Sequence, residues 1–170
     1  MNGKPRAILG IDPGKSKTSP GAAALWSENN WAAFYDWTTK KVAFETVRSW
    51  SMRFHIEAAG LEKIWSKPIN GHRGNAQLAE NVGAWRMLLI VLGIDWIEVA
   101  PQTWQAIIPA FMRDKTKQSH VEAAKYLIPG SDRFFDKKKY HGRADALLIA
   151  YYVKSRVRTE KRLFGGNHGN

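Results

Sequence analysis

Short apolar runs that end in turn residues alternate along this chain with stretches of helical periodicity. A continuous apolar run of this kind predicts a strand that is buried on both faces. In the first run, residues 6–12, apolar and glycine positions lead directly into Asp12, and Pro13 and Gly14 close the strand immediately afterwards. The tight turn between the second and third runs predicts an antiparallel meander. The later strands are expected at residues 21–26, 31–37, 58–65 and 94–99.

Helical periodicity fills the segments between and after these strands. Residues 38–55 carry apolar side chains near helical spacing, and Thr38 or Thr39 can cap the start of that helix. A broad apolar stripe in residues 75–92 predicts a helix that packs on the sheet and still leaves surface for a second subunit. Later helices are expected from residue 101, over 117–127, and from about 141 through 152 and beyond. This order of elements describes a mixed sheet flanked by helices, an α/β fold.

The composition bounds the class of protein. The chain has 170 residues and no obvious linker, so we expect one domain over residues 1–164 and a disordered tail at residues 165–170. It has no cysteine, which excludes disulfides and thiolate metal sites. We find neither an apolar run of membrane-spanning length nor the pattern of a signal peptide at the N-terminus. These features predict a cytoplasmic protein.

The charge is strongly unbalanced, with 26 Lys and Arg against 15 Asp and Glu, a formal net charge of +11. Such an excess on a small domain indicates a polyanionic partner, and nucleic acid is the first candidate. A ribosomal or anionic-membrane partner would produce the same excess. The chain also has eight Trp and five Tyr residues, and those that are exposed can stack on unpaired bases.

Three carboxylates fall on three separate predicted elements: Asp12 at the end of the first strand, Glu62 in the fourth strand, and Asp145 at the start of the last helix. A carboxylate in a buried strand is costly unless it is paired. For Asp12 alone, capping of the following turn is an equally good explanation. Glu57 is a competing carboxylate, but it lies at the entrance of its strand, where acidic residues are more often solvated.

Together the three carboxylates suggest a metal site. Oxygen ligands suit Mg²⁺ or Mn²⁺. Two such ions can activate a water molecule and stabilise the leaving oxygen of a phosphodiester. His141 precedes Asp145 by four residues, so both side chains project from one face of the first turn if both are helical. A basic protein with this site is expected to be a nuclease.

The motifs that hold these residues are Gly-Ile-Asp-Pro-Gly at 10–14, Leu-Glu-Lys-Ile-Trp at 61–65 and Arg-Ala-Asp-Ala-Leu-Leu-Ile-Ala at 143–150. In this order they resemble the motifs of RuvC-type Holliday junction resolvases of the RNase H-like superfamily. Residues 78–83 (Leu-Ala-Glu-Asn-Val-Gly) and 101–104 (Pro-Gln-Thr-Trp) also resemble the members carried by bacteriophages and prophages. The resemblance runs from about residue 7 to residue 152.

The resemblance implies an RNase H-like fold with a five-stranded mixed sheet, and a structure-selective endonuclease that resolves four-way and related branched DNA. The catalytic and metal-binding residues carried over are Asp12, Glu62 and Asp145, with two Mg²⁺ ions that Mn²⁺ can replace. The family's fourth ligand is an Asp or His just before the last aspartate, and His141 is the best match. His141 is then a metal ligand or a general acid or base. Alternatively, it is a solvent-facing residue at the start of the helix. Asp132 and Asp136 are the reserve candidates for the fourth ligand.

The same family implies a homodimer whose two active sites nick opposing strands of the junction at matched positions. We expect the interface on the helix at residues 75–92, where Trp85 and Met87 are either contacts or core residues. From its position alone, Trp65 or another aromatic residue near the loop after Glu62 is a candidate to insert into the open centre of the junction. Lys15 and Lys17 either meet a phosphate or belong to a solvated turn. The residues expected to contact DNA phosphates are Lys15, Lys17, Lys67, His72, Arg73, Lys137, Lys138, Lys139 and Arg143, together with the basic end of the last helix, which carries Lys154, Arg156, Arg158, Lys161 and Arg162.

Three alternatives stay open. The first is a less selective RNase H-like nuclease for branched DNA. The second is a non-catalytic, architectural junction-binding protein, and the third is a basic RNA-binding protein of translation. If the protein is phage-encoded, the expected location is the cytoplasm of the bacterial host.

Overall fold

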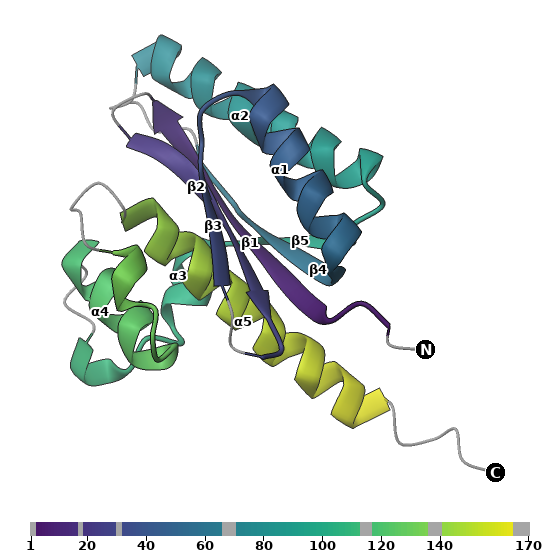
Figure 1. The fold of residues 1–170 in the computed structure, drawn as a ribbon. Coiled ribbons are helices and arrows are strands. Elements are labelled where there is room, and N and C mark those ends of the chain that lie inside the picture. Colours follow the sequence, from purple (N-terminus) through teal and green to yellow (C-terminus); the bar gives the residue numbers. More distant parts are fainter. Residues whose placement is uncertain are drawn as a thin grey trace.

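Five strands form one mixed sheet in the order β3-β2-β1-β4-β5 in this computed structural model (Figure 1). The structure describes residues 3–16, 19–29, 32–65, 71–112, 117–135 and 141–164. β1 pairs antiparallel with β2, β2 pairs antiparallel with β3, and β1, β4 and β5 run parallel. This arrangement confirms the α/β fold with the expected N-terminal meander. The strands are β1 (Arg6–Ser16), β2 (Ser19–Ser27), β3 (Ala32–Asp36), β4 (His55–Glu62) and β5 (Trp96–Val99).

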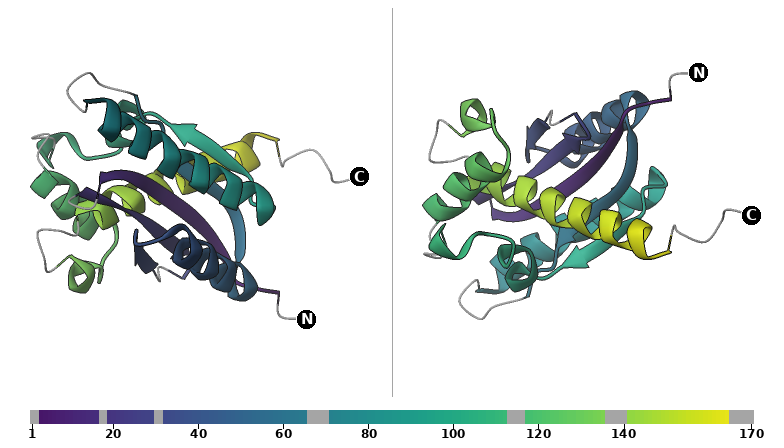
Figure 2. Two further views of the ribbon diagram at one scale, coloured as in Figure 1. Left: turned by 90° about the horizontal axis from the view of Figure 1, so that it is seen from above. Right: turned by 90° about the horizontal axis from the view of Figure 1, so that it is seen from below.

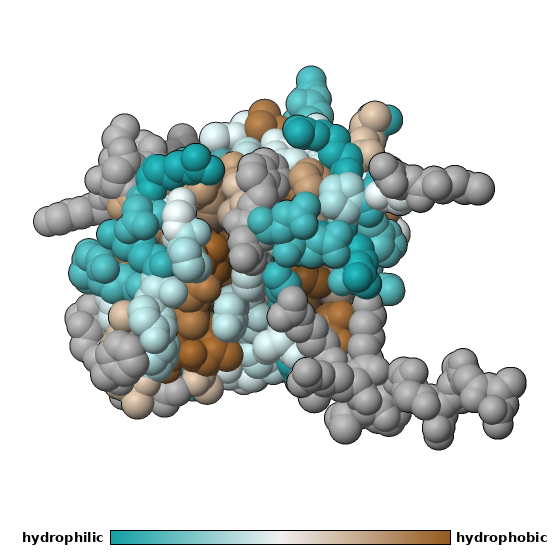
Figure 3. Space-filling view, turned by 60° about the horizontal axis from the view of Figure 1, so that its bottom comes forward, coloured by the Kyte–Doolittle hydropathy of each residue, from teal (hydrophilic) through white to brown (hydrophobic). Residues whose placement is uncertain are grey.

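Helices cover both faces of the sheet, as the two views of Figure 2 show. α1 (Lys40–Arg53) and α2 (Gly71–Val91) lie on one face. α5 (His141–Phe164) crosses the other face, with α3 (Pro101–Gln105) and α4 (Lys117–Leu127) on the same side. Seen from near the α5 side, hydrophilic side chains cover much of the described surface and leave narrow apolar strips between them (Figure 3).

The two faces bury separate sets of apolar side chains because successive strand residues alternate between faces. Leu9 and Ile11 of β1 pack in the cluster that contains Val47 of α1 and Trp85 of α2. Ile8 of the same strand packs in the other cluster with Leu147 and its neighbours in α5. The sheet is therefore a central layer with a hydrophobic core on each side.

Several element bounds differ from the sequence prediction, because pairing partners rather than local composition set them. β1 continues past Asp12 to Ser16, since Gly14 and Ser16 still pair with β2. Asp12 therefore lies inside the strand and not at its end. β4 runs over His55–Glu62 and not over residues 58–65, so Glu62 is its last residue. α2 begins at Gly71, before the apolar stripe starts.

The start of α1 matches one of the two predicted caps. Thr39 is the N-cap, and its hydroxyl accepts a 3.2 Å hydrogen bond from the Val42 backbone N–H. Within the described ranges, we find no helix that is long and apolar enough to cross a membrane. The expected tail at residues 165–170 lies outside the described residues.

Two glycines allow α5 to lie directly on the sheet. A Cβ atom on Gly10 of β1 would lie 1.9 Å from the Ala146 carbonyl oxygen and 2.6 Å from the Ala150 backbone nitrogen. A Cβ atom on Gly60 of β4 would lie 2.7 Å from side-chain methyl groups of Ile149 and Val153. The absence of side chains at these paired strand positions fixes how closely the helix approaches β1 and β4.

Candidate active site

Asp12 and Glu62 occupy adjacent positions on two parallel strands. Ile11 of β1 pairs with Leu61 of β4, and the next residue along each strand is one of the two carboxylates. Ile11 and Leu61 are fully buried in the core beneath α1 and α2. Because side chains alternate along a strand, Asp12 and Glu62 face the opposite side, which α5 covers.

The first turn of α5 brings Asp145 to the same end of the sheet. Ala146, the next residue, lies against Gly10 of β1, two positions before Asp12 and on the same face. Farther along α5, Tyr151 stacks on Trp26 with ring centroids 5.0 Å apart, so the helix runs from the active-site end of β1 toward the other end. Asp12, Glu62 and Asp145 therefore lie toward the same end of the sheet, on β1, β4 and α5.

The carboxylate of Asp12 caps the turn that follows it. Its Oδ1 accepts a 3.0 Å hydrogen bond from the backbone N–H of Gly14, which has a positive φ of 64°. The turn-capping explanation is thus correct for one oxygen of this carboxylate. Nearby, the buried Asn81 side chain of α2 donates from Nδ2 to the Pro13 carbonyl oxygen at 3.3 Å. Local hydrogen bonds on both sides of the sheet therefore fix the position of Asp12.

The other two carboxylates are held by residues that sequence reasoning did not assign to the site. The buried indole of Trp104, in α3, donates from Nε1 to Glu62 Oε1 at 3.1 Å. Nδ1 of His120, in α4, lies 2.7 Å from Asp145 Oδ1. The Trp104 and His120 rings meet edge to face, with centroids 5.2 Å apart and an interplanar angle of 71°.

The sequence held only a weak signal for these two residues. Trp104 belongs to the Pro-Gln-Thr-Trp segment, but nothing in that segment indicates that the indole reaches Glu62. His120 precedes Asp145 by 25 positions on a different helix, so no local spacing links the two residues. Both contacts depend on how the segment after β5 folds back onto α5.

His141 is the first residue of α5, one turn before Asp145 on the same helix. Its assignment as a fourth ligand or as an acid or base stays a prediction. Of the two reserves, Asp132 lies on an exposed 3₁₀ turn, and Asp136 lies outside the described residues. As the described side chains stand, no group of three or more His, Asp and Glu residues is placed to hold a metal ion. Each of the three carboxylates described above is held by a hydrogen-bonding neighbour: Asp12 by the Gly14 backbone N–H, Glu62 by Trp104 and Asp145 by His120.

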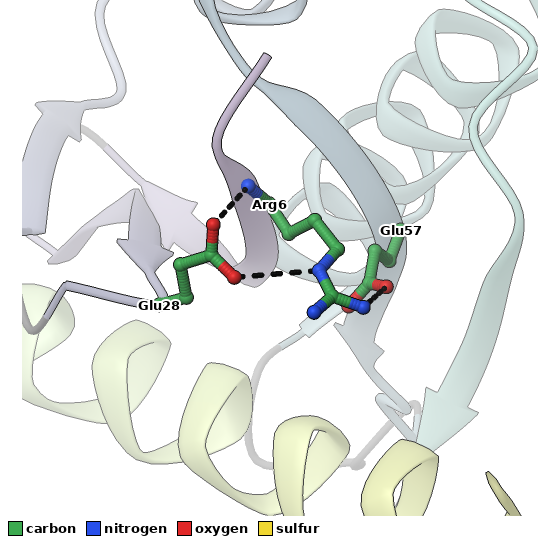
Figure 4. Close-up of polar contacts among 3 residues, drawn as sticks. All are labelled: Arg6, Glu28 and Glu57. Carbon is green, nitrogen blue, oxygen red and sulfur yellow. Dashed lines mark hydrogen bonds and ion pairs between the residues drawn. The ribbon is translucent and has the colours of Figure 1, made fainter. Parts of the chain in front are cut away.

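Glu57, the competing carboxylate, belongs to a separate ion-pair cluster around Arg6. Its Oε1 lies 3.6 Å from Arg6 Nη1, and Arg6 also donates from its backbone N and from Nε to Glu28 (Figure 4). The backbone N–H of Arg6 is the largest cause of the lowered pKa of Glu28. Arg6 is the first residue of β1, so this ion-pair cluster lies at the opposite end of the strand from Asp12. Glu57 is therefore not part of the carboxylate site.

The structure describes only some of the basic residues that are predicted to contact DNA. His72 and Arg73 are exposed in the first turn of α2. Arg143 forms an ion pair with the Asp36 carboxylate, and its contact with DNA stays a prediction. Lys15 lies in β1, although its side chain is not among those the structure describes. Outside the described residues lie Lys17, Lys67, Lys137, Lys138 and Lys139.

The structure gives different outcomes for the two tryptophans that were predicted to contact a partner, Trp85 and Trp65. Trp85 is fully buried, so it is a core residue and not an interface contact. Trp65 is 57% exposed directly after β4, and the Lys63 ammonium lies 4.6 Å from the centre of its ring. The exposed indole is available for stacking, and its role at a junction stays a prediction.

The mixed sheet with flanking helices and this strand order is an RNase H-like fold. Solved structures of RuvC from Thermus thermophilus share it. The RuvC structure in complex with a Holliday junction substrate superposes with a TM-score of 0.63 and 14% sequence identity, covering 91% of this chain and 96% of that chain. A second Thermus thermophilus RuvC structure gives a TM-score of 0.60, also with 14% identity, and covers 90% of this chain and 96% of that chain. No family model matches the sequence, and the search of curated proteins found no match. At this identity the likeness establishes the fold.

Proposed function

We propose that this protein is a structure-selective endodeoxyribonuclease of the RuvC type, which hydrolyses phosphodiester bonds of four-way and related branched DNA with the help of divalent metal ions. The observation that carries the proposal is the placement of Asp12, Glu62 and Asp145 at one end of the sheet, on β1, β4 and α5. The fold is shared with a RuvC protein in complex with a Holliday junction substrate, and the net charge of +11 suits a nucleic-acid partner.

The donor chemistry of the site fits a hard divalent cation. Asp12, Glu62 and Asp145 offer only carboxylate oxygens, which Mg²⁺ and Mn²⁺ prefer. These three residues would hold the metal, with His141 as an additional ligand or as an acid or base. When bound, such ions supply Lewis-acid activation of water and of the scissile phosphate. The chain itself supplies the orientation of the carboxylates, through Gly14, Trp104 and His120.

Binding of the junction is assigned to the exposed basic residues, which would contact phosphates without reading sequence. His72 and Arg73 are described members of this group, and both are exposed. The affinity should fall steeply with salt concentration because each phosphate contact releases counterions.

A homodimer completes the proposal. A four-way junction has near two-fold symmetry, so two identical active sites related by a C2 axis would nick opposing strands at matched positions. α2 offers a surface for this pairing, since Met87, Ile90 and Val91 are 59%, 63% and 61% exposed. Large apolar side chains that cluster at a surface are typical of subunit interfaces.

The test is cleavage of an end-labelled four-way DNA junction in Mg²⁺, in Mn²⁺ and in EDTA, followed on a denaturing gel. The intact protein is expected to make paired, metal-dependent nicks in opposing strands. Asp12→Asn, Glu62→Gln and Asp145→Asn should each abolish cleavage while binding of the junction survives. Glu57→Gln is the matched control, because Glu57 lies in the Arg6 ion-pair cluster away from the site, and it should cut like the intact protein.

Other outcomes would replace the proposal. Tight junction binding without cleavage in any metal would indicate an architectural protein. Equal cleavage of flaps, Y-branches and four-way junctions would indicate a less selective branched-DNA nuclease. Preference for structured RNA over DNA would move the protein to another class. Full activity in any of the three carboxylate variants would show that the assigned site is wrong.

A further inference from the structure

The contact between His120 and Asp145 joins two helices at the candidate active site. His120 Nδ1 and Asp145 Oδ1 are 2.7 Å apart, and the two side chains are only 13% and 21% exposed. The ionised carboxylate that metal binding requires can only accept hydrogen bonds, so in that form Nδ1 of His120 is the donor. The bond restricts rotation of the Asp145 carboxylate and directs its second oxygen.

His120 is itself held in place. α4 packs on α5 through Ala123 and Ala124, which are fully buried in the same core as the first turns of α5. The His120 and Trp104 rings meet in a T-shaped contact with centroids 5.2 Å apart, and Trp104 is 1% exposed. Trp104 in turn donates to Glu62. One buried pair of rings therefore contacts a carboxylate from the sheet and another from α5.

We propose that His120 is a positioning residue that orients the Asp145 carboxylate for divalent-metal binding, with the Trp104 ring as its support. This inference rests on the proposed function, because it assumes that Asp145 is a metal ligand. Groups that hydrogen-bond to metal ligands fix the ligand geometry, and their loss typically weakens metal affinity by about 10- to 100-fold. His120 orients the carboxylate and is not itself assigned to touch metal or DNA.

The use of Nδ1 predicts which substitution can replace the histidine. The amide nitrogen of asparagine is attached to Cγ, as Nδ1 is in histidine, so His120→Asn can donate from nearly the same position. The amide nitrogen of glutamine lies one bond farther out and corresponds to the other ring nitrogen. His120→Asn should therefore retain the bond to Asp145, and both His120→Gln and His120→Ala should lose it.

The test measures Mn²⁺ binding to the full-length, DNA-free protein by titration calorimetry and by the electron paramagnetic resonance signal of free Mn²⁺. We expect His120→Ala and His120→Gln to weaken Mn²⁺ binding about 10- to 100-fold, while His120→Asn keeps an affinity close to that of the intact protein. His55→Ala is the control, since His55 is an exposed histidine at the start of β4, away from the site. Circular dichroism melts of all variants check folding.

Two results would overturn the inference: unchanged Mn²⁺ affinity in His120→Ala, or equal losses in His120→Asn and His120→Ala. Absence of Mn²⁺ binding by the intact protein would also overturn it. Failure of the proposed function is a separate result, because it appears as loss of junction cleavage by the intact protein. A protein that binds Mn²⁺ in the predicted His120-dependent way but cuts no branched DNA would keep the positioning role and remove the nuclease assignment.

Discussion

The guanidinium of Arg143 binds the carboxylate of Asp36 through two 2.7 Å hydrogen bonds, from Nε to Oδ1 and from Nη2 to Oδ2. Nη1 of the same side chain donates to the carbonyl oxygen of Phe134 at 3.2 Å. Asp36 is the last residue of β3, and Ala22 of β2 pairs with both Asp36 and Asp12. The Arg143 contacts therefore fix the first turn of α5, which carries Asp145, to the same row of the sheet as Asp12.

Replacing Arg143 should destabilise the fold. We expect Arg143→Met to lower the free energy of unfolding by about 1–3 kcal/mol, less than for a fully buried pair because the Asp36 side chain is 36% exposed and water screens part of the interaction. Arg143→Lys should not restore the loss, since an ammonium cannot make the paired contacts of a guanidinium. Urea unfolding measures both variants, and the Arg143→Met, Asp36→Asn double mutant gives the coupling. Wild-type stability in Arg143→Met would contradict a structural role for the pair.

A methyl group at Gly10 should disrupt the contact between β1 and α5. Its Cβ would lie 1.9 Å from the Ala146 carbonyl oxygen, and a backbone atom can give way only if the whole helix shifts. Overpacking typically costs about 1–3 kcal/mol, and we expect Gly10→Ala to reach the upper end of that range. The displaced helix would also move Asp145, so cleavage should fall together with stability.

The matched control for this change is Gly83→Ala. Gly83 lies in the middle of α2, and a Cβ atom there would meet nothing within 4 Å. Alanine in a helix interior is favoured over glycine by about 0.5–1 kcal/mol, so this variant should be slightly more stable than the intact protein. If urea unfolding gave Gly10→Ala the same stability as Gly83→Ala, the close approach of α5 would not be a feature of the folded protein.

Asn81 is a buried polar residue whose contacts support the Asp12 turn. It is 3% exposed, donates to the Pro13 carbonyl oxygen at 3.3 Å, and accepts from Gln77 Nε2 at 3.2 Å. Asn81→Leu should cost about 1–3 kcal/mol because it leaves the Pro13 carbonyl without this donor. The single-turnover cleavage rate should fall as well, since the turn after Asp12 loses its support from α2.

Gln77→Ala is the comparison for Asn81→Leu, because it removes the hydrogen bonds of Gln77 to Asn81 and to the exposed Glu80 but leaves the bond from Asn81 to Pro13 in place. It should have a smaller effect on both the unfolding free energy and the cleavage rate. An Asn81→Leu protein that is less stable but cuts junctions at the intact rate would show that this contact supports the fold and not the site.

The hydrophobic pattern predicted the order of the elements because each strand and helix carries its own periodicity. The bounds depend on partners instead: β1 extends to Ser16 because Gly14 and Ser16 pair with β2. β4 ends at Glu62, whose Cα partner Val99 is the last residue of β5. Local composition contains no information on either pairing. The side chain of Trp85 was equally suited to a core or an interface, and only packing against α1 and the sheet resolved it.

The elements that carry the three candidate carboxylates were predictable for a related reason. Asp12, Glu62 and Asp145 each follow or begin a recognisable apolar segment, so their elements were clear before their proximity was. His120 and Trp104 were not predictable, because their contacts join α4 to α5 and α3 to β4. The three carboxylates lie in motifs that could be recognised in the sequence, while the contacts that Trp104 and His120 make with two of them could not be predicted from it.

The exposed apolar residues of α2 give the last prediction. Met87, Ile90 and Val91 are about 60% exposed, and burying such side chains against a second copy would contribute about 25 cal/mol per Å² of apolar surface. Ile90→Glu places a charge in this patch and should shift the protein from dimer to monomer in light scattering after gel filtration. The variant should still bind metal, but it should nick the opposing strands of a junction independently, since the paired cut requires two active sites on one complex.

Met52→Glu, at a 67% exposed position on α1, is the control and should leave the oligomeric state unchanged. An Ile90→Glu protein with an unchanged oligomeric state would remove the α2 interface, and a monomeric variant that still makes matched nicks would remove the symmetric mechanism.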